Sequence, residues 1–90
     1  MAAITVEVVY ARPDRQVLVE VQVEEGARLE AAIRQSEIAK RFPREDLSGL
    51  EVGIWGRIVG RDAVLSDGDR VEIYRPLVRD PREARRERAR

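Results

Sequence analysis

Three carboxylates and a glycine lie close together near the end of the chain, at Asp67, Gly68, Asp69 and Glu72. A hard cation such as calcium takes oxygen ligands of this kind. The spacing does not match the calcium loop of an EF-hand, because the distal bidentate glutamate of that loop is missing. Aspartate and glycine also form turns, through hydrogen bonds to the local backbone. We therefore interpret Asp67-Gly68-Asp69 as a turn that leads into a strand.

Other kinds of reactive site find no support in the sequence. The 90 residues include no cysteine and no histidine, which excludes a thiolate nucleophile, a histidine base and a soft-ligand zinc site. Glu24-Glu25-Gly26 indicates a loop, since nothing nearby would desolvate the carboxylates for acid/base work. Gly53, Gly56 and Gly60 do not make a phosphate loop, because no lysine follows them. We expect no catalytic residue, no metal, no cofactor and no enzymatic activity.

The first third of the chain predicts a β-hairpin. Residues 4–10 alternate between apolar and more polar side chains, and residues 17–23 place a valine at every second position. This is the period of half-buried strands, and Pro13-Asp14 supplies the turn between them. The side chains expected to face the core are Ile4, Val6, Val8, Tyr10, Val17, Val19, Val21 and Val23.

A short helix is predicted after Gly26, where the period of the apolar residues changes. Leu29, Ala32 and Ile33 fall on one helical face, so we expect a helix at about residues 27–36 that covers the sheet. Ile38 and Phe42 are expected to return the chain to the core. No stretch is apolar for long enough to span a bilayer, and the N-terminus lacks the basic start of a signal peptide, so we expect a cytoplasmic location.

The second half of the chain predicts two or three further strands. A third strand at about residues 51–55 would point Val52 and Ile54 inward and Gly53 and Trp55 to the opposite face. A short strand at residues 57–59 and a last strand that carries Val71 and Ile73 and ends before Pro76 would follow. This order predicts an α+β protein of the β-grasp, or ubiquitin-like, class, with a mixed sheet of four to five strands and one helix packed on one face. Residues 1–78 would form this domain.

Four segments, spread along nearly the whole chain, resemble segments of a known protein family. They are VEVVYARPDRQ at 6–16, VGIWGR at 52–57, LSDGDRVEIYRPL at 65–77 and RDPREARRERAR at 79–90. Together they resemble the RnfH family of small bacterial ubiquitin-like proteins. The resemblance implies two settings: a name drawn from a membrane electron-transport operon, and in other members a proposed antitoxin whose partner is a START-like ribosome-inhibiting protein. It brings no catalytic motif.

Residues 79–90 form an arginine-rich tail with unusual charge. Six arginines face three acids there, so the tail carries +3 and residues 1–78 carry −3. Asp80-Pro81 begins a capping box, yet the few apolar residues that follow predict a flexible or marginal helix. The tail either binds an anionic partner, such as nucleic acid or the ribosome, or stays solvated. Its arginines are Arg79, Arg82, Arg85, Arg86, Arg88 and Arg90.

The C-terminus argues against carrier chemistry. Sulfur carriers and modifiers with this fold end in Gly-Gly, whose slim backbone enters an activating enzyme and presents a carboxylate for adenylation. This sequence ends in Arg88-Ala89-Arg90 and contains no adjacent glycine pair. A role as a sulfur carrier is therefore the weakest of the functions considered.

The open face of the sheet remains as the candidate site. Trp55 and Tyr74 are expected to project from it, and aromatic side chains are common anchors of protein interfaces. Alternatively, a loop or the tail covers Trp55, which then only adds stability. We expect a monomeric, non-enzymatic module that binds another cytoplasmic protein, with nucleic-acid or ribosome binding as the alternative. The partner-binding residues predicted are Trp55, Tyr74, Val9, Leu18, Arg57 and Arg75.

Overall fold

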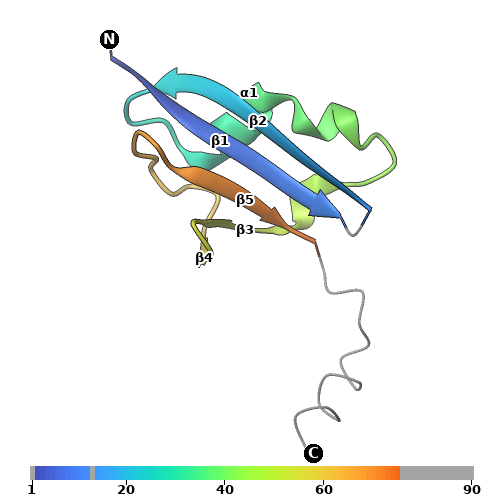
Figure 1. Cartoon of the computed structure of the whole chain (residues 1–90). Coiled ribbons are helices and arrows are strands. Elements are labelled where there is room, and N and C mark those ends of the chain that lie inside the picture. Colours follow the sequence, from blue (N-terminus) through green and yellow to red (C-terminus); the bar gives the residue numbers. More distant parts are fainter. Residues whose placement is uncertain (1, 13, 76–90) are drawn as a thin grey trace, which may run out of the picture.

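The computed structural model describes residues 2–12 and 14–75. The arginine-rich tail and its predicted helix start lie outside these residues. Figure 1 shows the chain as a sheet with one α-helix behind it. The elements are β1 (Ala3–Arg12), β2 (Arg15–Glu24), α1 (Leu29–Ser36), two 3-10 helices, η1 (Ile38–Arg41) and η2 (Leu47–Gly49), β3 (Glu51–Ile54), β4 (Arg57–Val59) and β5 (Arg70–Tyr74).

The sheet has the strand order β2-β1-β5-β3-β4. β1 and β5, which are the first and last strands, pair in parallel at its centre, with Val8 opposite Val71 and Tyr10 opposite Ile73. The β1–β2, β3–β5 and β3–β4 pairs are antiparallel. The α-helix crosses one face between the two hairpins (Figure 1). The predicted β-grasp fold is thus confirmed, with five strands in a mixed sheet.

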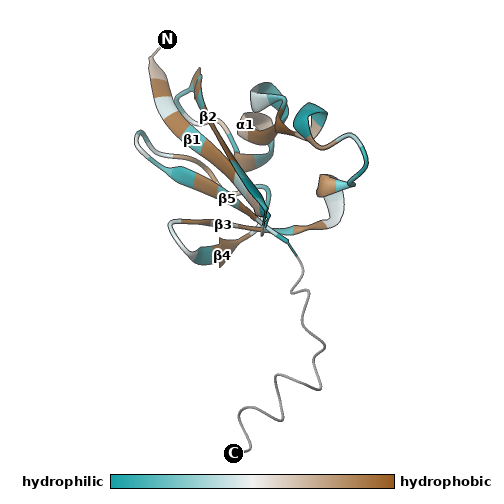
Figure 2. Cartoon of the chain, turned by 45° about the vertical axis from the view of Figure 1, so that its right-hand side comes forward, coloured by the Kyte–Doolittle hydropathy of each residue, from teal (hydrophilic) through white to brown (hydrophobic). Residues whose placement is uncertain are grey.

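The core lies between the sheet and the helical segments. Figure 2 shows apolar and polar residues alternating along β1, with α1 on one side of the sheet only. Tyr10 is fully buried, and its ring meets that of Phe42 edge to face with centroids 4.8 Å apart. Ile38 and Phe42 are both buried, so they anchor the segment after α1 as predicted. The rest of the buried cluster is Ile4, Val6, Val8, Val17, Val23, Leu29, Ala32, Leu47, Val52, Leu65, Val71 and Ile73.

α1 begins two residues later than predicted because a turn comes first. Gly26 has a φ of 90°, and the Ala27 N–H donates to the Glu24 carbonyl at 2.9 Å, which closes that turn. The helix ends where Glu37 adopts a φ of 56° and donates its N–H to the Arg34 carbonyl. A left-handed residue directly after the last turn is a common way for a helix to stop. None of the helices in the described part of the chain is long and apolar enough to cross a membrane.

The turn before β5 is held by its two aspartates. The Asp67 carboxylate accepts the Thr5 N–H at 2.8 Å, and the Asp69 carboxylate accepts the Ser66 N–H at 2.8 Å. Gly68, with a φ of 87°, donates its N–H to the Thr5 carbonyl. The predicted turn is confirmed, and it also docks on the start of β1, which sets the register of the central parallel pair.

The buried face of β5 supplies a stability test. Ile73 is 4% exposed and lies between Tyr10 of β1 and Val52 of β3. Ile73→Ala should lower the free energy of unfolding by ~2 to 5 kcal/mol, because truncation of a buried branched side chain leaves a cavity. Chemical denaturation measures the loss. A loss below ~0.5 kcal/mol would contradict the buried position of Ile73.

Candidate functional site

The face of the sheet away from α1 carries one row of residues that crosses all five strands. Leu18 of β2 lies opposite Val9 of β1, and Val9 lies opposite Glu72 of β5. Glu72 lies opposite Gly53 of β3, which lies opposite Ile58 of β4. Residues that face one another across a ladder share a side of the sheet. We call this side the open face.

Exposure along this row is uneven. Leu18 is 43% exposed and Ile58 is 61% exposed, whereas Val9 is only 8% exposed. Val9 was predicted to take part in binding, and this part of the prediction is wrong in one respect. The residue lies on the open face as expected, but its strand is flanked on both sides by paired strands, so it offers almost no accessible surface.

Trp55 lies at the tip of a hairpin, which corrects the predicted strand at 51–55. β3 ends at Ile54, and Trp55-Gly56 alone connects it to Arg57. Their φ angles are 49° and 84°, and positive values at both positions are what the tight two-residue turn of a hairpin requires. Glycine adopts this conformation freely, whereas a left-handed tryptophan costs about 1–2 kcal/mol.

A short stack of charged and aromatic groups supports Trp55. The Arg70 guanidinium carbon lies 5.1 Å from the centre of the Trp55 ring. The backbone N–H of Trp55 donates to the backbone carbonyl of Arg70 at 3.1 Å. Arg70 Nε also pairs with the Glu7 carboxylate at 3.0 Å. Trp55 nevertheless remains 61% exposed. The alternative that Trp55 is covered therefore finds no support among the described residues, although the tail lies outside them.

The Glu72 carboxylate joins the hairpin turn to β5. One of its oxygens, Oε1, accepts the Gly56 N–H at 2.7 Å and the Tyr74 hydroxyl at 2.8 Å. Burial, this hydrogen bond and the negative charge of Glu72 together raise the pKa of Tyr74 to about 12. Within the described residues, no group of three or more acidic, histidine or cysteine side chains is arranged to hold a metal ion. Glu72 thus acts as a structural acceptor.

The ring of Tyr74 occupies the space above Gly53. A Cβ atom at residue 53 would lie 2.7 Å from Tyr74 Cε2 and 2.6 Å from the Arg57 carbonyl oxygen. No real side chain fits within such distances, so Gly53 is required for the tyrosine to lie flat over β3. The phenol can then reach Glu72, two residues back along its own strand.

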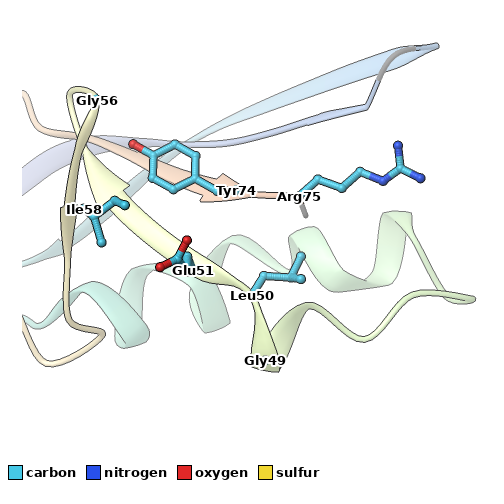
Figure 3. Close-up of a pocket in the computed structure, with 7 residues that line it drawn as sticks. All are labelled: Gly49, Leu50, Glu51, Gly56, Ile58, Tyr74 and Arg75. Atoms are coloured by element: carbon cyan, nitrogen blue, oxygen red, sulfur yellow. The ribbon is translucent and has the colours of Figure 1, made fainter. Parts of the chain in front are cut away.

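An open groove of about 580 Å³ follows from this arrangement. Figure 3 shows Tyr74 across from Ile58 and Glu51, with its hydroxyl directed toward Gly56. The groove runs from the β3–β4 hairpin to the end of β5, where Arg75 lines it and its side chain extends away from the Tyr74 ring. Its lining residues are Gly49, Leu50, Glu51, Gly56, Ile58, Tyr74 and Arg75.

The two arginines predicted at the edge of the binding surface, Arg57 and Arg75, differ in where they lie. Arg75 is among the lining residues of the groove, but its side chain extends past the end of β5, away from Tyr74 (Figure 3). Arg57 lies opposite Ile54, so it belongs to the side of the sheet that carries α1, and the prediction that it accompanies Trp55 and Tyr74 on the open face is wrong. Because side chains alternate along a strand, its neighbour Ile58 takes the open face instead.

Ile58 is the residue that the sequence-based prediction missed. It is the most exposed apolar side chain in the groove, and it lies beside Tyr74 in Figure 3. The signal lies in the dipeptide Trp55-Gly56. If these two residues form the turn of a hairpin, Ile54 pairs with Arg57 and Gly53 pairs with Ile58. A tryptophan at the first turn position concealed this signal.

Comparison with known proteins bears on the family and on the fold. A family model described as RnfH family ubiquitin matches residues 4–88. The chain belongs to the RnfH family. The protein RnfH of Pseudoalteromonas atlantica is 57% identical over 86 residues, which cover 96% of this chain and 80% of that protein.

Two solved structures place the RnfH fold among its neighbours. A 3D domain-swapped dimer of protein HI0395 from Haemophilus influenzae is 45% identical and has a TM-score of 0.54, covering 89% of this chain and all of that one. A putative molybdopterin converting factor, subunit 1, from Pyrococcus furiosus is 25% identical with a TM-score of 0.62, covering 82% of this chain and 99% of that one. The second likeness shows that the fold is shared with a protein named for cofactor synthesis.

The close fit of Tyr74 over Gly53 predicts a strict size limit at residue 53. Gly53→Ala should lower the free energy of unfolding by ~1 to 3 kcal/mol, because the added methyl collides with the tyrosine ring and a backbone carbonyl. Gly49→Ala is the matched control, since a Cβ there meets nothing within 4 Å. It should change stability by less than ~0.5 kcal/mol. Equal effects in denaturation experiments would contradict the proposed contact.

The Glu72–Tyr74 hydrogen bond predicts a shift in tyrosine ionisation. Both tyrosines have a pKa raised above the ordinary value of 10.0, Tyr74 to about 12. Because the folded pKa is the higher one, the stabilisation from the neutral phenol is complete below pH 10 and is lost as the pH rises through about 12. Glu72→Gln removes the negative charge, so the pKa of Tyr74 should fall toward 10.0 while burial keeps it above that value.

Tyrosinate absorbance measures this shift, with circular dichroism at each pH as the check on folding. Half of the absorbance change should move to lower pH in Glu72→Gln, because the chain has two tyrosines. A titration curve of Glu72→Gln identical to that of the wild-type protein would contradict the bond.

Proposed function

We propose that this protein is a non-enzymatic interaction module whose groove on the open face receives an apolar side chain of a partner protein. The observation that supports it most directly is the exposure of Ile58 beside a groove with an ordered aromatic wall. Large exposed apolar groups next to a concave surface are typical of interfaces.

The groove has features that suit a polypeptide partner. Glu72, Gly53 and the turn hold Tyr74 in place, so little side-chain entropy is lost when a partner docks. Glu51 and Arg75 supply one negative and one positive group among the lining residues. A complementary partner segment would carry an apolar anchor between a basic and an acidic residue. Trp55 extends the apolar surface past the hairpin tip.

The family resemblance indicates which partner to test first. We propose that the partner is a cytoplasmic protein, and a START-like ribosome-inhibiting protein is the first candidate, with this chain as the antitoxin-type subunit. Sulfur-carrier chemistry is the weaker alternative: the fold is shared with a molybdopterin converting factor subunit, but the sequence has no adjacent glycine pair. We propose that the monomer is the binding form, because one chain lines the whole groove.

Alanine variants of the groove and of the hairpin tip test the proposal. Ile58→Ala in the groove and Trp55→Ala at the hairpin tip beside it should each weaken binding of a purified START-like partner by ~2 kcal/mol or more, since the partner would cover both exposed apolar anchors. Both side chains are exposed, so the fold should survive. Titration calorimetry of the wild-type and variant proteins against the same partner measures the difference.

Val64→Ala is the matched control. Val64 is 55% exposed but pairs in an isolated bridge with Arg28, next to α1, and does not line the groove. Its truncation should leave affinity unchanged. If no START-like protein binds, the same three variants serve as baits in lysate. Proteins retained by the wild type and by Val64→Ala but lost with Ile58→Ala would support the groove. Equal retention by all baits would contradict it.

A further inference from the structure

Four arginines surround a second hollow, at the end of the domain where β1 turns into β2. Arg12 and Arg15 come from this hairpin, and Arg41 and Arg44 come from the segment after α1. The two segments lie side by side at the right-hand end of the molecule in Figure 1. The hollow has a volume of about 220 Å³ and is completed by Phe42, Pro43 and Glu45. We call this group of four arginines the arginine end.

A half-buried hydrogen-bond network fixes the two segments to each other. Glu45 accepts the Tyr10 hydroxyl at 2.5 Å through one oxygen and pairs with Arg12 Nη1 at 2.7 Å through the other. Arg12 Nε also lies 3.3 Å from Asp14. Asp14 and Glu45 thus both lie within ion-pair distance of Arg12, and the four arginines outnumber these two acids, so an excess of positive charge remains at this end.

Within the part of the chain that the structure describes, the remaining three arginines have no acidic partner. Arg15 lies over the ring of Phe42, with its guanidinium carbon 5.0 Å from the ring centre. Arg15, Arg41 and Arg44 are exposed, and none forms an ion pair within residues 2–12 and 14–75. Guanidinium groups match the oxygens of phosphate in a planar, two-pronged geometry. Residues 1–78 carry a net charge of −3, so this concentration of positive charge is a local feature.

We propose that the arginine end binds the phosphate backbone of nucleic acid and does not read the bases. A protein partner would need an apolar anchor there, but Phe42 is buried and none of the large exposed apolar side chains lines the hollow. A base would need a free aromatic face on which to stack, and Phe42 is already covered by Arg15.

Charge removal on the full-length chain tests this site. Arg44→Ala should lower the affinity for a short RNA of mixed sequence about fivefold at ~0.1 M salt. The double variant, which combines Arg41→Ala and Arg44→Ala, should lower this affinity about 25-fold. The slope of log affinity against log salt should fall by about 0.7 for each arginine removed, because each contact releases counterions. Fluorescence anisotropy at several salt concentrations measures both quantities. Single-stranded DNA of the same length should bind alike.

Arg57→Ala is the control with the same loss of charge. Arg57 is exposed on β4, has no ion pair among the described residues and does not line the hollow. It should change affinity less than twofold and leave the salt slope unaltered. An unchanged slope in the double variant would overturn the proposal and assign binding to the tail. Equal competition by polyglutamate would also overturn it, in favour of an acidic polypeptide. Neither result bears on the groove, whose variants are separate.

Discussion

The parallel pairing of β1 with β5 is the constraint on which the rest of the structure depends. It joins residues that are more than sixty positions apart, as in the ion pair of Glu7 with Arg70. Parallel neighbours need a long crossover, and here α1 and the two 3-10 helices supply it on one side of the sheet. The crossover covers that side and leaves the other side bare. The open face is therefore a consequence of topology before any side chain is considered.

The open face is ordered by polar contacts that reach across strands. Glu72 holds a turn of one hairpin and a tyrosine of its own strand through a single oxygen. At the other end of the sheet, Glu45 similarly connects Tyr10 and Arg12 from β1 to the loop after α1. In both places a carboxylate satisfies a buried or half-buried tyrosine hydroxyl and fixes a loop. The groove and the hollow at the arginine end each lie beside one of these two networks.

Periodicity predicted the fold well because the core strands are long and regular. The valines of β2 and the alternation of β1 fixed the inward face, and the helix followed from Leu29 and its neighbours. The site was harder to predict for local reasons. Whether Trp55 ends a strand or begins a turn changes which of Arg57 and Ile58 faces outward, and tryptophan is an unusual residue for a positive φ. The burial of Val9 depends on the strands on both sides, which no pattern within β1 reveals.

The contact between Gly53 and Tyr74 also has an evolutionary consequence. A side chain at 53 would meet the Tyr74 ring and also the Arg57 carbonyl oxygen, so a smaller residue at 74 would not by itself make room for it. Position 53 should therefore stay glycine among relatives whichever residue stands at 74. Ile58 is under no such restriction, since its exposed side chain fills space that belongs to solvent. Natural selection can thus retain the rigid wall of the groove while it varies the residue beside it, and different lineages can acquire different partners on one unchanged scaffold.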